Sequence, residues 1–436
     1  MTTRTQRTIP MRVARQFILA CLIVTLFLSI GGVASVRAAT FAVVNTSDTG
    51  SGSLRSAIMQ ANASPGSTIS FGITGGGAQT ITLMSSLPTI TGNVTVDGTT
   101  APGYTGTPLV TLDGGNRAIT AFTVGAGATL NLSSFIIQHM FPSGIVNAGT
   151  LNVANATLAN NVAISGGAIN NTGTLIVTGC TFQSNDADND GGALYTSGGA
   201  TITNSLFSMN LSQGGDGGAI AIVGSTVTVV GSTFSGNRTN GFGGAIVVRT
   251  VSGPPRIVGM LSLINSTVSG NSAVSLGGGV YLAPYSSAIL TNDTVTGNSL
   301  GSGGIGGGIY TESGATATLA NTIVANNTTT GNGVGPDLSG QYSDGGHNLI
   351  REMDTSTGFT DVSMGGTDYT GTIAAPRDPG LVALPLANNG GPTPTEALLP
   401  TSIAINHGDN PICNNKTGPA PVGGKDQRGV LRPQGS

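Results

Sequence analysis

The segment GGAIAIVGSTVTVVGSTFSGN, residues 217–237, contains the two elements that decide the fold: Gly-Gly-Ala-Ile at its start and Phe-Ser-Gly-Asn at its end. Both elements recur in alternation from about residue 158 to residue 326. The first begins at Gly166, Gly191, Gly217, Gly243, Gly277 and Gly306, and the second ends at Asn161, Asn185, Asn210, Asn237, Asn271, Asn298 and Asn326. Successive asparagines lie 24 to 34 residues apart. This period is too long for a coiled coil and is typical of a solenoid of stacked units.

Between the glycine pairs, Val, Ile, Leu and Thr alternate as they do in β-strands, for example in Thr174–Thr178 and Thr226–Val230. Aromatic residues make up 4% of the chain and charged residues 8%, and tryptophan is absent. Such a composition argues against a compact domain built around large side chains. Glycine, at 70 of 436 residues, raises the alternative of a disordered low-complexity chain, which the strand-like alternation disfavours. The sequence therefore predicts an all-β protein, a right-handed parallel β-helix of about ten coils.

The repeated asparagine has a structural explanation. An asparagine at the same corner of every coil can bond to the next one through its amide, so the asparagines are expected to stack as a ladder. The hydrophobic residue three positions earlier then points into the core. Thr239, two residues beyond Asn237, is expected at an exposed turn.

Residues 40–71 differ from the repeats and are expected to cap the first coil. A strand is predicted at residues 41–44 and a helix at residues 53–62, with Ser53 as its N-cap. Leu54, Ala57, Ile58 and Ala61 form one apolar stripe of this helix. Laid across the end of the solenoid, that stripe covers hydrophobic side chains and strand edges that would otherwise be exposed.

The chain divides into four predicted regions. Residues 1–39 have the layout of a secretory signal peptide: four arginines precede an apolar run at residues 17–30, and cleavage is expected after Ala38 or, second, after Ala39. An uncleaved membrane anchor is the alternative, although the apolar run is short for a span. Residues 40–71 form the cap, residues 72–350 form the repeats, and residues 351–436 form a tail rich in Gly, Pro, Asp and Thr.

Removal of the signal peptide takes away five arginines and no acid, which leaves 11 basic and 19 acidic residues. No basic patch remains to bind phosphates, so nucleic acid is not an expected partner. Cys180 lies in a repeat and Cys413 in the tail, and their positions imply no mutual disulfide. Cys413 is expected to react with thiol reagents in the folded protein.

The sequence resembles known families in three places: the repeats, the N-terminal cap and the tail. The combination of Gly-Gly-Ala-Ile with Phe-x-x-Asn resembles the repeat of polymorphic outer membrane proteins, bacterial surface β-helices associated with adhesion. Residues 53–58 (SLRSAI) look like the CSLREAI domain found at the start of such secreted proteins, with Gly52 in place of the family cysteine and Ser56 in place of the glutamate. The implied fold is a pectate-lyase-like β-helix.

The tail is similar to choice-of-anchor Q domains. The matching residues are 389–400 (NGGPTPTEALLP), 402–406 (SIAIN), Gly408-Asp409 and the run from Asp426-Gln-Arg-Gly429 through Arg432-Pro433. The family pattern continues through a Cys-Asp-Ile-Gly-Ala-like strand, whereas this chain stops at Ser436. Together the resemblances imply a surface or secreted location, and they imply no established chemistry.

The sequence nominates no catalytic, cofactor-binding or metal-ligating residue. Asp186, Asp188 and Asp190 alternate before Gly191 like the start of a calcium loop, but Ser197 stands where an EF-hand needs its bidentate carboxylate. A weaker calcium site at these aspartates is left open. His139, His347 and His407 are isolated in the sequence, and turn or surface positions are expected for all three.

These observations favour a non-enzymatic surface or secreted β-helix that serves adhesion or binds a glycan or protein ligand along its strand faces. The alternative is a polysaccharide lyase or glycosidase on the same fold. A glycosidase needs two nearby carboxylates, usually with aromatic side chains for the sugar, and the repeats suggest no such pair. No cofactor and no membrane span after signal cleavage are expected, and the oligomeric state is left open.

Overall fold

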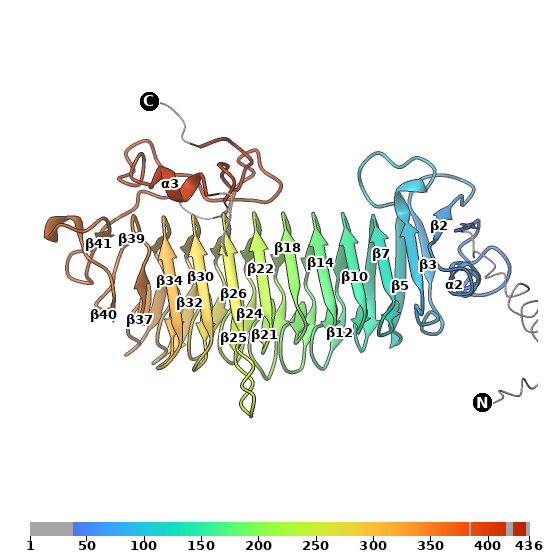
Figure 1. Cartoon of the computed structure of the whole chain (residues 1–436), viewed down its shortest axis with the longest axis horizontal. Coiled ribbons are helices and arrows are strands. Elements are labelled where there is room, and N and C mark those ends of the chain that lie inside the picture. Colours follow the sequence, from blue (N-terminus) through green and yellow to red (C-terminus); the bar gives the residue numbers. More distant parts are fainter. Residues whose placement is uncertain (1–37, 383–384, 416–421, 433–436) are drawn as a thin grey trace, which may run out of the picture. The chain divides into compact units, whose positions relative to one another are not determined.

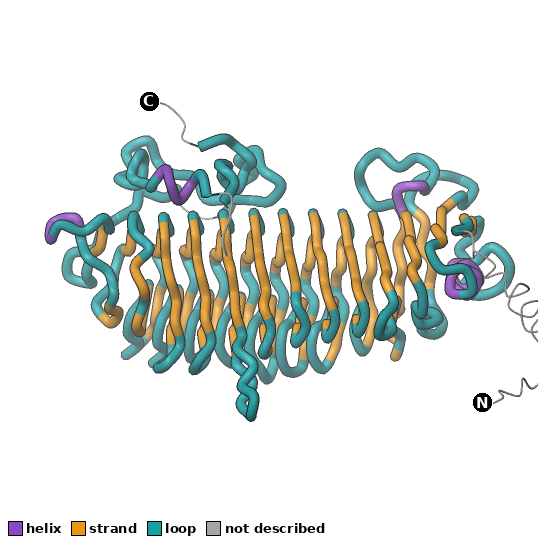
Figure 2. Tube along the Cα trace, in the orientation of Figure 1, coloured by secondary structure: helices purple, strands orange, loops and turns teal. Residues whose placement is uncertain are grey.

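A computed structural model describes residues 38–382, 385–415 and 422–432, so nearly all of the predicted signal peptide lies outside the described residues. From Thr40 onward the chain winds into a right-handed parallel β-solenoid of about 12 turns (Figure 1). Strands and turns alternate regularly along the solenoid (Figure 2). Equivalent strands of successive coils pair in parallel and form four sheets.

The first sheet contains β1 (Thr40–Val43), β2 (Ser67–Phe71), β4 (Asn93–Asp97), β7 (Thr129–Ser133), β10 (Thr150–Ala154), β14 (Thr174–Thr178), β18 (Ala200–Thr203), β22 (Thr226–Val230), β26 (Met260–Ile264), β30 (Ser287–Thr291), β34 (Thr316–Ala320) and β38 (Ser343–Asp344). The second contains β3 (Gln79–Thr82), β5 (Val110–Ala118), β8 (Phe135–Phe141), β11 (Thr157–Ala159), β15 (Thr181–Gln183), β19 (Leu206–Ser208), β23 (Thr233–Ser235), β27 (Thr267–Ser269), β31 (Thr294–Thr296), β35 (Ile323–Ala325), β39 (Leu349–Ile350) and β41 (Tyr369–Thr370).

The third and smallest sheet contains β12 (Val162–Ala163), β16 (Asp186–Ala187), β20 (Leu211–Ser212), β24 (Arg238–Thr239), β28 (Ser272–Ala273), β32 (Ser299–Ser302) and β36 (Thr328–Thr330). The fourth, a ten-stranded sheet, contains β6 (Phe122–Val124), β9 (Ile145–Asn147), β13 (Ile169–Asn171), β17 (Leu194–Thr196), β21 (Ile220–Val223), β25 (Ile246–Arg249), β29 (Val280–Leu282), β33 (Ile309–Thr311), β37 (Leu338–Gln341) and β40 (Thr355–Thr357). The helical segments are α2 (Leu54–Asn62), η1 (Gly98–Thr100), η2 (Val362–Met364) and α3 (Asn410–Cys413).

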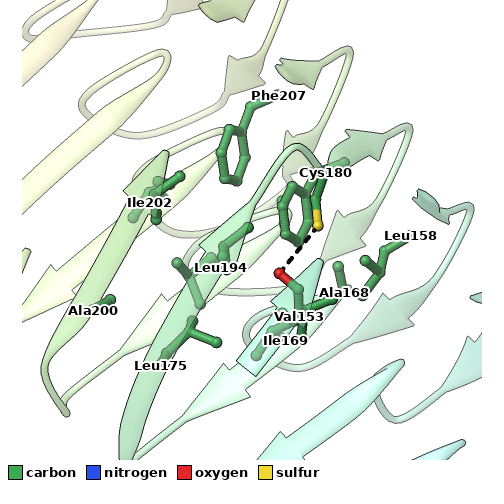
Figure 3. Close-up of a cluster of buried hydrophobic side chains, with 14 of the residues drawn as sticks. Val153, Leu158, Ala168, Ile169, Leu175, Cys180, Leu194, Ala200, Ile202 and Phe207 are labelled. Atoms are coloured by element: carbon green, nitrogen blue, oxygen red, sulfur yellow. Dashed lines mark hydrogen bonds between the residues drawn. The ribbon is translucent and has the colours of Figure 1, made fainter. Parts of the chain in front are cut away.

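The core runs along the solenoid axis as stacked rows of identical or similar side chains. Phe182, Phe207 and Phe234 align in register, and neighbouring rings stack with centroids 4.4 and 4.9 Å apart. Figure 3 shows this core, in which the Cys180 thiol lies 3.5 Å from the carbonyl oxygen of Val153. Each coil thus needs only aliphatic and a few aromatic side chains, which explains how a chain with 4% aromatic residues builds a continuous core.

The predicted number of coils, about ten, is slightly too low. The first coils are hard to recognise in the sequence because they lack the alternation of glycine pair and asparagine that marks residues 158–326. At the other end, β40 and β41 add strands to two sheets, so pairing continues past Ile350 to Thr370. The stretch from Asn237 to Asn271 is long because residues 250–259 form a projecting loop with a Val251–Ile257 bridge.

The predicted helix is confirmed as α2. Ser53 is its N-cap, and its hydroxyl accepts a hydrogen bond from the Ser56 N–H at 3.2 Å. The buried residues are Leu54, Ala57, Ile58 and Ala61, the four residues of the predicted stripe. These side chains join the interior cluster beside β1, β2 and β4 at one end of the solenoid (Figure 1).

The predicted asparagine ladder is also confirmed. Along the row, each side-chain amide donates to the amide oxygen of the next asparagine over 2.8–3.0 Å. The ladder residues are Asn161, Asn185, Asn210, Asn237, Asn271, Asn298 and Asn327. The last predicted position is wrong by one residue: Asn326 is exposed in the left-handed region, with φ of 59°, while Asn327 occupies the ladder.

The expectation of an exposed turn at Thr239 is wrong. It is buried rather than exposed, and its hydroxyl donates to the carbonyl oxygen of Gly215 at 2.6 Å and accepts from the Gly241 N–H at 3.0 Å. The residue belongs to a short strand of the third sheet and not to an open turn.

Asp337 ends the ladder. Its Oδ1 accepts from the backbone N–H and the side-chain amide of Asn327, at 3.0 and 2.9 Å. Burial raises the pKa of Asp337 from 3.8 to about 7. The folded protein thus holds a proton that the unfolded chain releases, so this contribution to stability is complete below about pH 4 and is lost as the pH rises through 7.

We therefore expect the melting temperature of the protein to fall between pH 5 and pH 8, and we expect that of Asp337→Asn to fall less. The amide of asparagine resembles the protonated acid in shape and charge but does not titrate. Burial also raises the pKa of Glu396. The substitution of Asp337 should therefore remove only part of the fall in melting temperature with pH. Circular dichroism melting curves at several pH values in this range give the melting temperature of each protein as a function of pH. If the melting temperatures of both proteins fell by the same amount between pH 5 and pH 8, the assignment to Asp337 would be contradicted.

The tail folds back along the coils rather than extending from them. The side-chain amide of Gln427 donates to the Ser232 carbonyl oxygen at 3.1 Å and to the Thr233 hydroxyl at 2.8 Å, and its oxygen accepts from the Thr267 hydroxyl at 2.7 Å. Cys413 is buried where the tail meets the coils, with 5% of its surface exposed. This burial contradicts the expectation that Cys413 is accessible, although both Cys180 and Cys413 are free thiols.

Candidate functional site

A row of outward-facing side chains crosses the ten-stranded sheet and brings aromatic residues together on the outside of the solenoid. Tyr195, Ala221, Val247, Tyr281 and Tyr310 occupy equivalent positions on β17, β21, β25, β29 and β33. Because parallel strands pair in register and side chains alternate between faces, residues from coils far apart in sequence meet in one line.

A second line of residues runs beside this row, at the position just before each glycine pair. Asp190, Asp216, Phe242 and Leu276 occupy it on successive coils, and Phe242 bridges to Leu276. The ring of Phe242 lies 5.0 Å from that of Tyr281. We call the two lines, with Arg249 and Glu312, the tyrosine face.

The tyrosine face has an apolar half and a charged half. In the apolar half, Tyr281 stacks on Tyr310 with ring centroids 5.9 Å apart and planes 19° apart. Val247 and Tyr281 are buried, whereas Tyr195, Phe242 and Tyr310 keep part of their surface exposed. These residues form a hydrophobic cluster separate from the interior core, so their burial is not needed to fill the solenoid.

Arg249 organises the charged half. Its guanidinium donates to Asp190 Oδ2 at 2.9 Å and also to Asp216 Oδ2. The remaining oxygens are used as well: Asp190 Oδ1 accepts from the Asp216 N–H at 3.0 Å, and Asp216 Oδ1 accepts from the Phe242 N–H at 2.7 Å. Both carboxylates are thereby fixed in place beside the aromatic residues.

Glu312 closes the other end of the face. Its Oε2 accepts a hydrogen bond from the Tyr281 hydroxyl. Burial raises the pKa of Tyr281, and the nearby Glu312 raises it further, so the hydroxyl remains protonated and keeps its role as a donor. The ring and the carboxylate are therefore held in one orientation.

The aspartates considered for calcium do not converge. Asp190 is paired with Arg249, and Asp186 accepts from the Gln213 side-chain amide at 2.6 Å. Burial raises the pKa of Asp186, and the Asp188 charge adds to this effect. Across the described parts of the chain, no group of three or more His, Cys, Asp or Glu side chains is arranged to hold a metal ion.

The three histidines are less isolated than their sequence positions indicate. The Nδ1 atom of His139 lies 3.2 Å from Asp113 Oδ2. His347 and His407 come together where the tail meets the last coils: His347 Nδ1 lies 3.0 Å from the His407 carbonyl oxygen, and the Tyr369 hydroxyl lies 3.0 Å from His407 Nδ1. These contacts do not follow from sequence spacing, because the first joins two neighbouring coils 26 residues apart and the others join the last coils to the tail.

Sequence reasoning also misses the tyrosine face, although the sequence contains a signal for it. Tyr195, Tyr281 and Tyr310 each lie four residues after the first glycine of a pair, at Gly191, Gly277 and Gly306. Aligning the coils on their glycine pairs places the three tyrosines in one row.

Comparisons with known proteins add no relative: no family model matches the chain, and no curated protein matches it. Within the described residues, no helix is long and apolar enough to cross a membrane. The chain is thus assigned to a fold, the right-handed parallel β-helix, by its structure.

Proposed function

We propose that this protein is an exported, non-enzymatic β-helix that binds an extended polysaccharide across its tyrosine face and acts in adhesion. The observation that carries the proposal is the alignment of Tyr195, Tyr281 and Tyr310 beside fixed carboxylates and a guanidinium. Aromatic faces pack against the apolar faces of sugar rings, while charged and amide groups bond to hydroxyls. The export expectation rests on residues 1–39, and the resemblance of the repeats to bacterial surface β-helices supports it.

The geometry of the face favours a chain-like ligand. Tyr195 and Tyr310 belong to coils four steps apart in the sheet, which at about 4.8 Å per step places them roughly 19 Å from each other. A single sugar ring cannot contact both residues. An oligosaccharide lying across the strands can contact them together.

The arrangement of the acids favours binding over hydrolysis. Glycosidases need one carboxyl group that donates a proton and a second that acts as nucleophile or base. Here Arg249 binds both Asp190 and Asp216, and Glu312 accepts from Tyr281. Each acid of the face already has a partner that holds it as a hydrogen-bond acceptor.

Binding of the mature protein to a polysaccharide array, followed by calorimetry on the best ligand, would test the proposal. We expect Tyr195→Ala and Tyr310→Ala each to weaken binding by about tenfold, the loss typical of an aromatic contact residue. Tyr285→Ala is the matched control: this tyrosine is 52% exposed and lies outside the face. Equal effects of all three substitutions, or no polysaccharide binding, would contradict the site.

The same samples test the absence of turnover. We expect neither reducing ends nor unsaturated products after prolonged incubation with the bound polysaccharide. Product release that is lost in Asp190→Asn or Glu312→Gln would instead establish the enzymatic alternative.

A further inference from the structure

A second candidate site lies away from the tyrosine face, where the tail covers the second sheet. A cavity of about 330 Å³ opens between the coils that contain β27, β31 and β35 and three described parts of the tail, residues 381, 389–398 and 426–432. This volume is at the lower end of the range of small-molecule pockets. Its wall combines apolar side chains, such as Ile323 and Leu398, with Asn292, Glu396 and Arg428.

The tail is hydrogen-bonded to the coils on both sides of the cavity. Gln427 bonds to Ser232, Thr233 and Thr267 of the coils, as described above. On the other side, Asn321 and Asp409 exchange two hydrogen bonds: the Asn321 amide donates to the Asp409 carbonyl oxygen at 3.1 Å, and the Asp409 N–H donates to Asn321 Oδ1 at 2.8 Å.

Most charges around the cavity are compensated within the protein. Arg428 donates to Asp426 Oδ2 at 2.6 and 2.9 Å. Asp293 is fully buried, and its carboxyl oxygens accept from the Ser266 and Thr291 N–H groups at 2.7 and 2.8 Å. Burial nevertheless raises the pKa of Asp293 well above its usual value, so this group is held as a hydrogen-bonded, protonated acid. Arg432 adds a favourable charge near Asp293.

Glu396 differs from these groups. Its Oε2 is shielded from solvent and has no hydrogen-bond partner among the described residues. Burial raises the pKa of Glu396 to about 7, and no neighbouring positive charge opposes this effect. An acid in such surroundings is stabilised by any cation that enters beside it.

We infer that the cavity binds a small organic cation, a protonated amine with an apolar body, and that the Glu396 carboxylate is its counter-ion. Ile323 and Leu398 contact the apolar body. A neutral hydroxylated ligand could donate a hydrogen bond to the carboxylate but would bring no positive charge to balance it. The following experiment separates cationic from neutral ligands.

Cyclohexylamine and its neutral counterpart cyclohexanol are suitable probes because they differ only in the charged group. By calorimetry at pH 7.5, we expect the full mature chain to bind the amine at least about tenfold more tightly than the alcohol. Binding of the amine should also tighten by nearly tenfold from pH 6 to pH 8, because only the ionised fraction of Glu396 is competent. Equal affinity for the two probes, or binding of neither, would overturn the inference.

Two variants locate the site. Glu396→Gln should abolish the preference for the amine, whereas Asp188→Asn, which removes an exposed acid of the coils, should leave it intact. Ala397→Phe narrows the cavity without altering its charges and should abolish binding while the melting temperature shows that the protein still folds. Retention of the preference for the amine in Glu396→Gln, or of amine binding in Ala397→Phe, would show that the amine binds elsewhere.

A third comparison separates this site from the proposed polysaccharide site. Tyr195→Ala and Tyr310→Ala should leave amine binding unchanged. Loss of amine binding in either would place the cation on the tyrosine face and refute the cavity assignment.

Discussion

Replacing Gly244 by alanine is expected to destabilise the protein by about 3 kcal/mol, the upper end of the usual cost of overpacking. Gly244 is the second glycine of its pair and has no special backbone conformation, so the reason is steric. A Cβ atom there would lie 2.8 Å from the Ser272 nitrogen and even closer to the Gly278 carbonyl oxygen. Both neighbours are backbone atoms of the next coil, which cannot move without breaking the parallel pairing.

Gly199 provides the control for this substitution. It is exposed, and a Cβ atom at this position would meet only the Thr226 carbonyl oxygen at 3.9 Å. Gly199→Ala should therefore be neutral or slightly stabilising, because alanine restricts the unfolded chain. Guanidinium unfolding followed by circular dichroism measures both free energies. Similar values for the two variants would show that the coils do not pack as closely as described.

The second large effect is expected for Asn237→Ala, which should cost about 2 to 4 kcal/mol. The Asn237 side chain makes four hydrogen bonds in the interior: its oxygen accepts from the Asn210 N–H and amide, and its amide donates to the Phe207 carbonyl oxygen and to Asn271 Oδ1. Alanine would keep the backbone N–H that donates to Asn271 Oδ1, and the Asn210 amide would keep its bond to the Phe182 carbonyl oxygen. The buried Asn210 N–H and Phe207 carbonyl oxygen would each lose the Asn237 side chain as a partner, at about 1 to 3 kcal/mol for each group that finds no replacement.

Asn240→Ala is the matched control because it removes the same side chain from the same coil. Asn240 is exposed, and its amide donates to the Gln213 carbonyl oxygen at 2.6 Å, where water can substitute for it. We expect a change within about 0.5 kcal/mol. If denaturant unfolding gives the same loss for both variants, the ladder does not contribute to stability in the way its geometry indicates.

Those features that repeat in every coil could be predicted from the sequence. Asn237 and Gly217 belong to elements that recur six or seven times, and each recurrence supports the same structural role. Helix α2 was equally accessible because capping and side-chain periodicity are local properties. The error at Asn326 arises from the same logic: two adjacent asparagines fit the pattern, and only the register of Val324 against Val295 identifies Asn327 as the ladder residue.

Features that depend on contacts between distant coils could not be predicted in this way. Arg249 reaches Asp190 across 59 residues of sequence, and Gln427 reaches Ser232 across 195. No local pattern encodes such distances, since they depend on how many coils intervene. The tail motif containing Gln427 is recognisable by resemblance, but its role in attaching the tail to the coils required the structure.

The asparagine ladder also allows the number of coils to change by duplication of whole coils. All its amides point the same way, so each coil presents to its neighbours one donor and one acceptor that are identical along the row. Asp337 ends the row because its carboxyl group accepts from the Asn327 amide but has no N–H group that could donate to a further coil. Duplication of one coil within the row would therefore produce a longer rod with unchanged ends, and the distance between any two surface sites could be altered in discrete steps without redesigning either site.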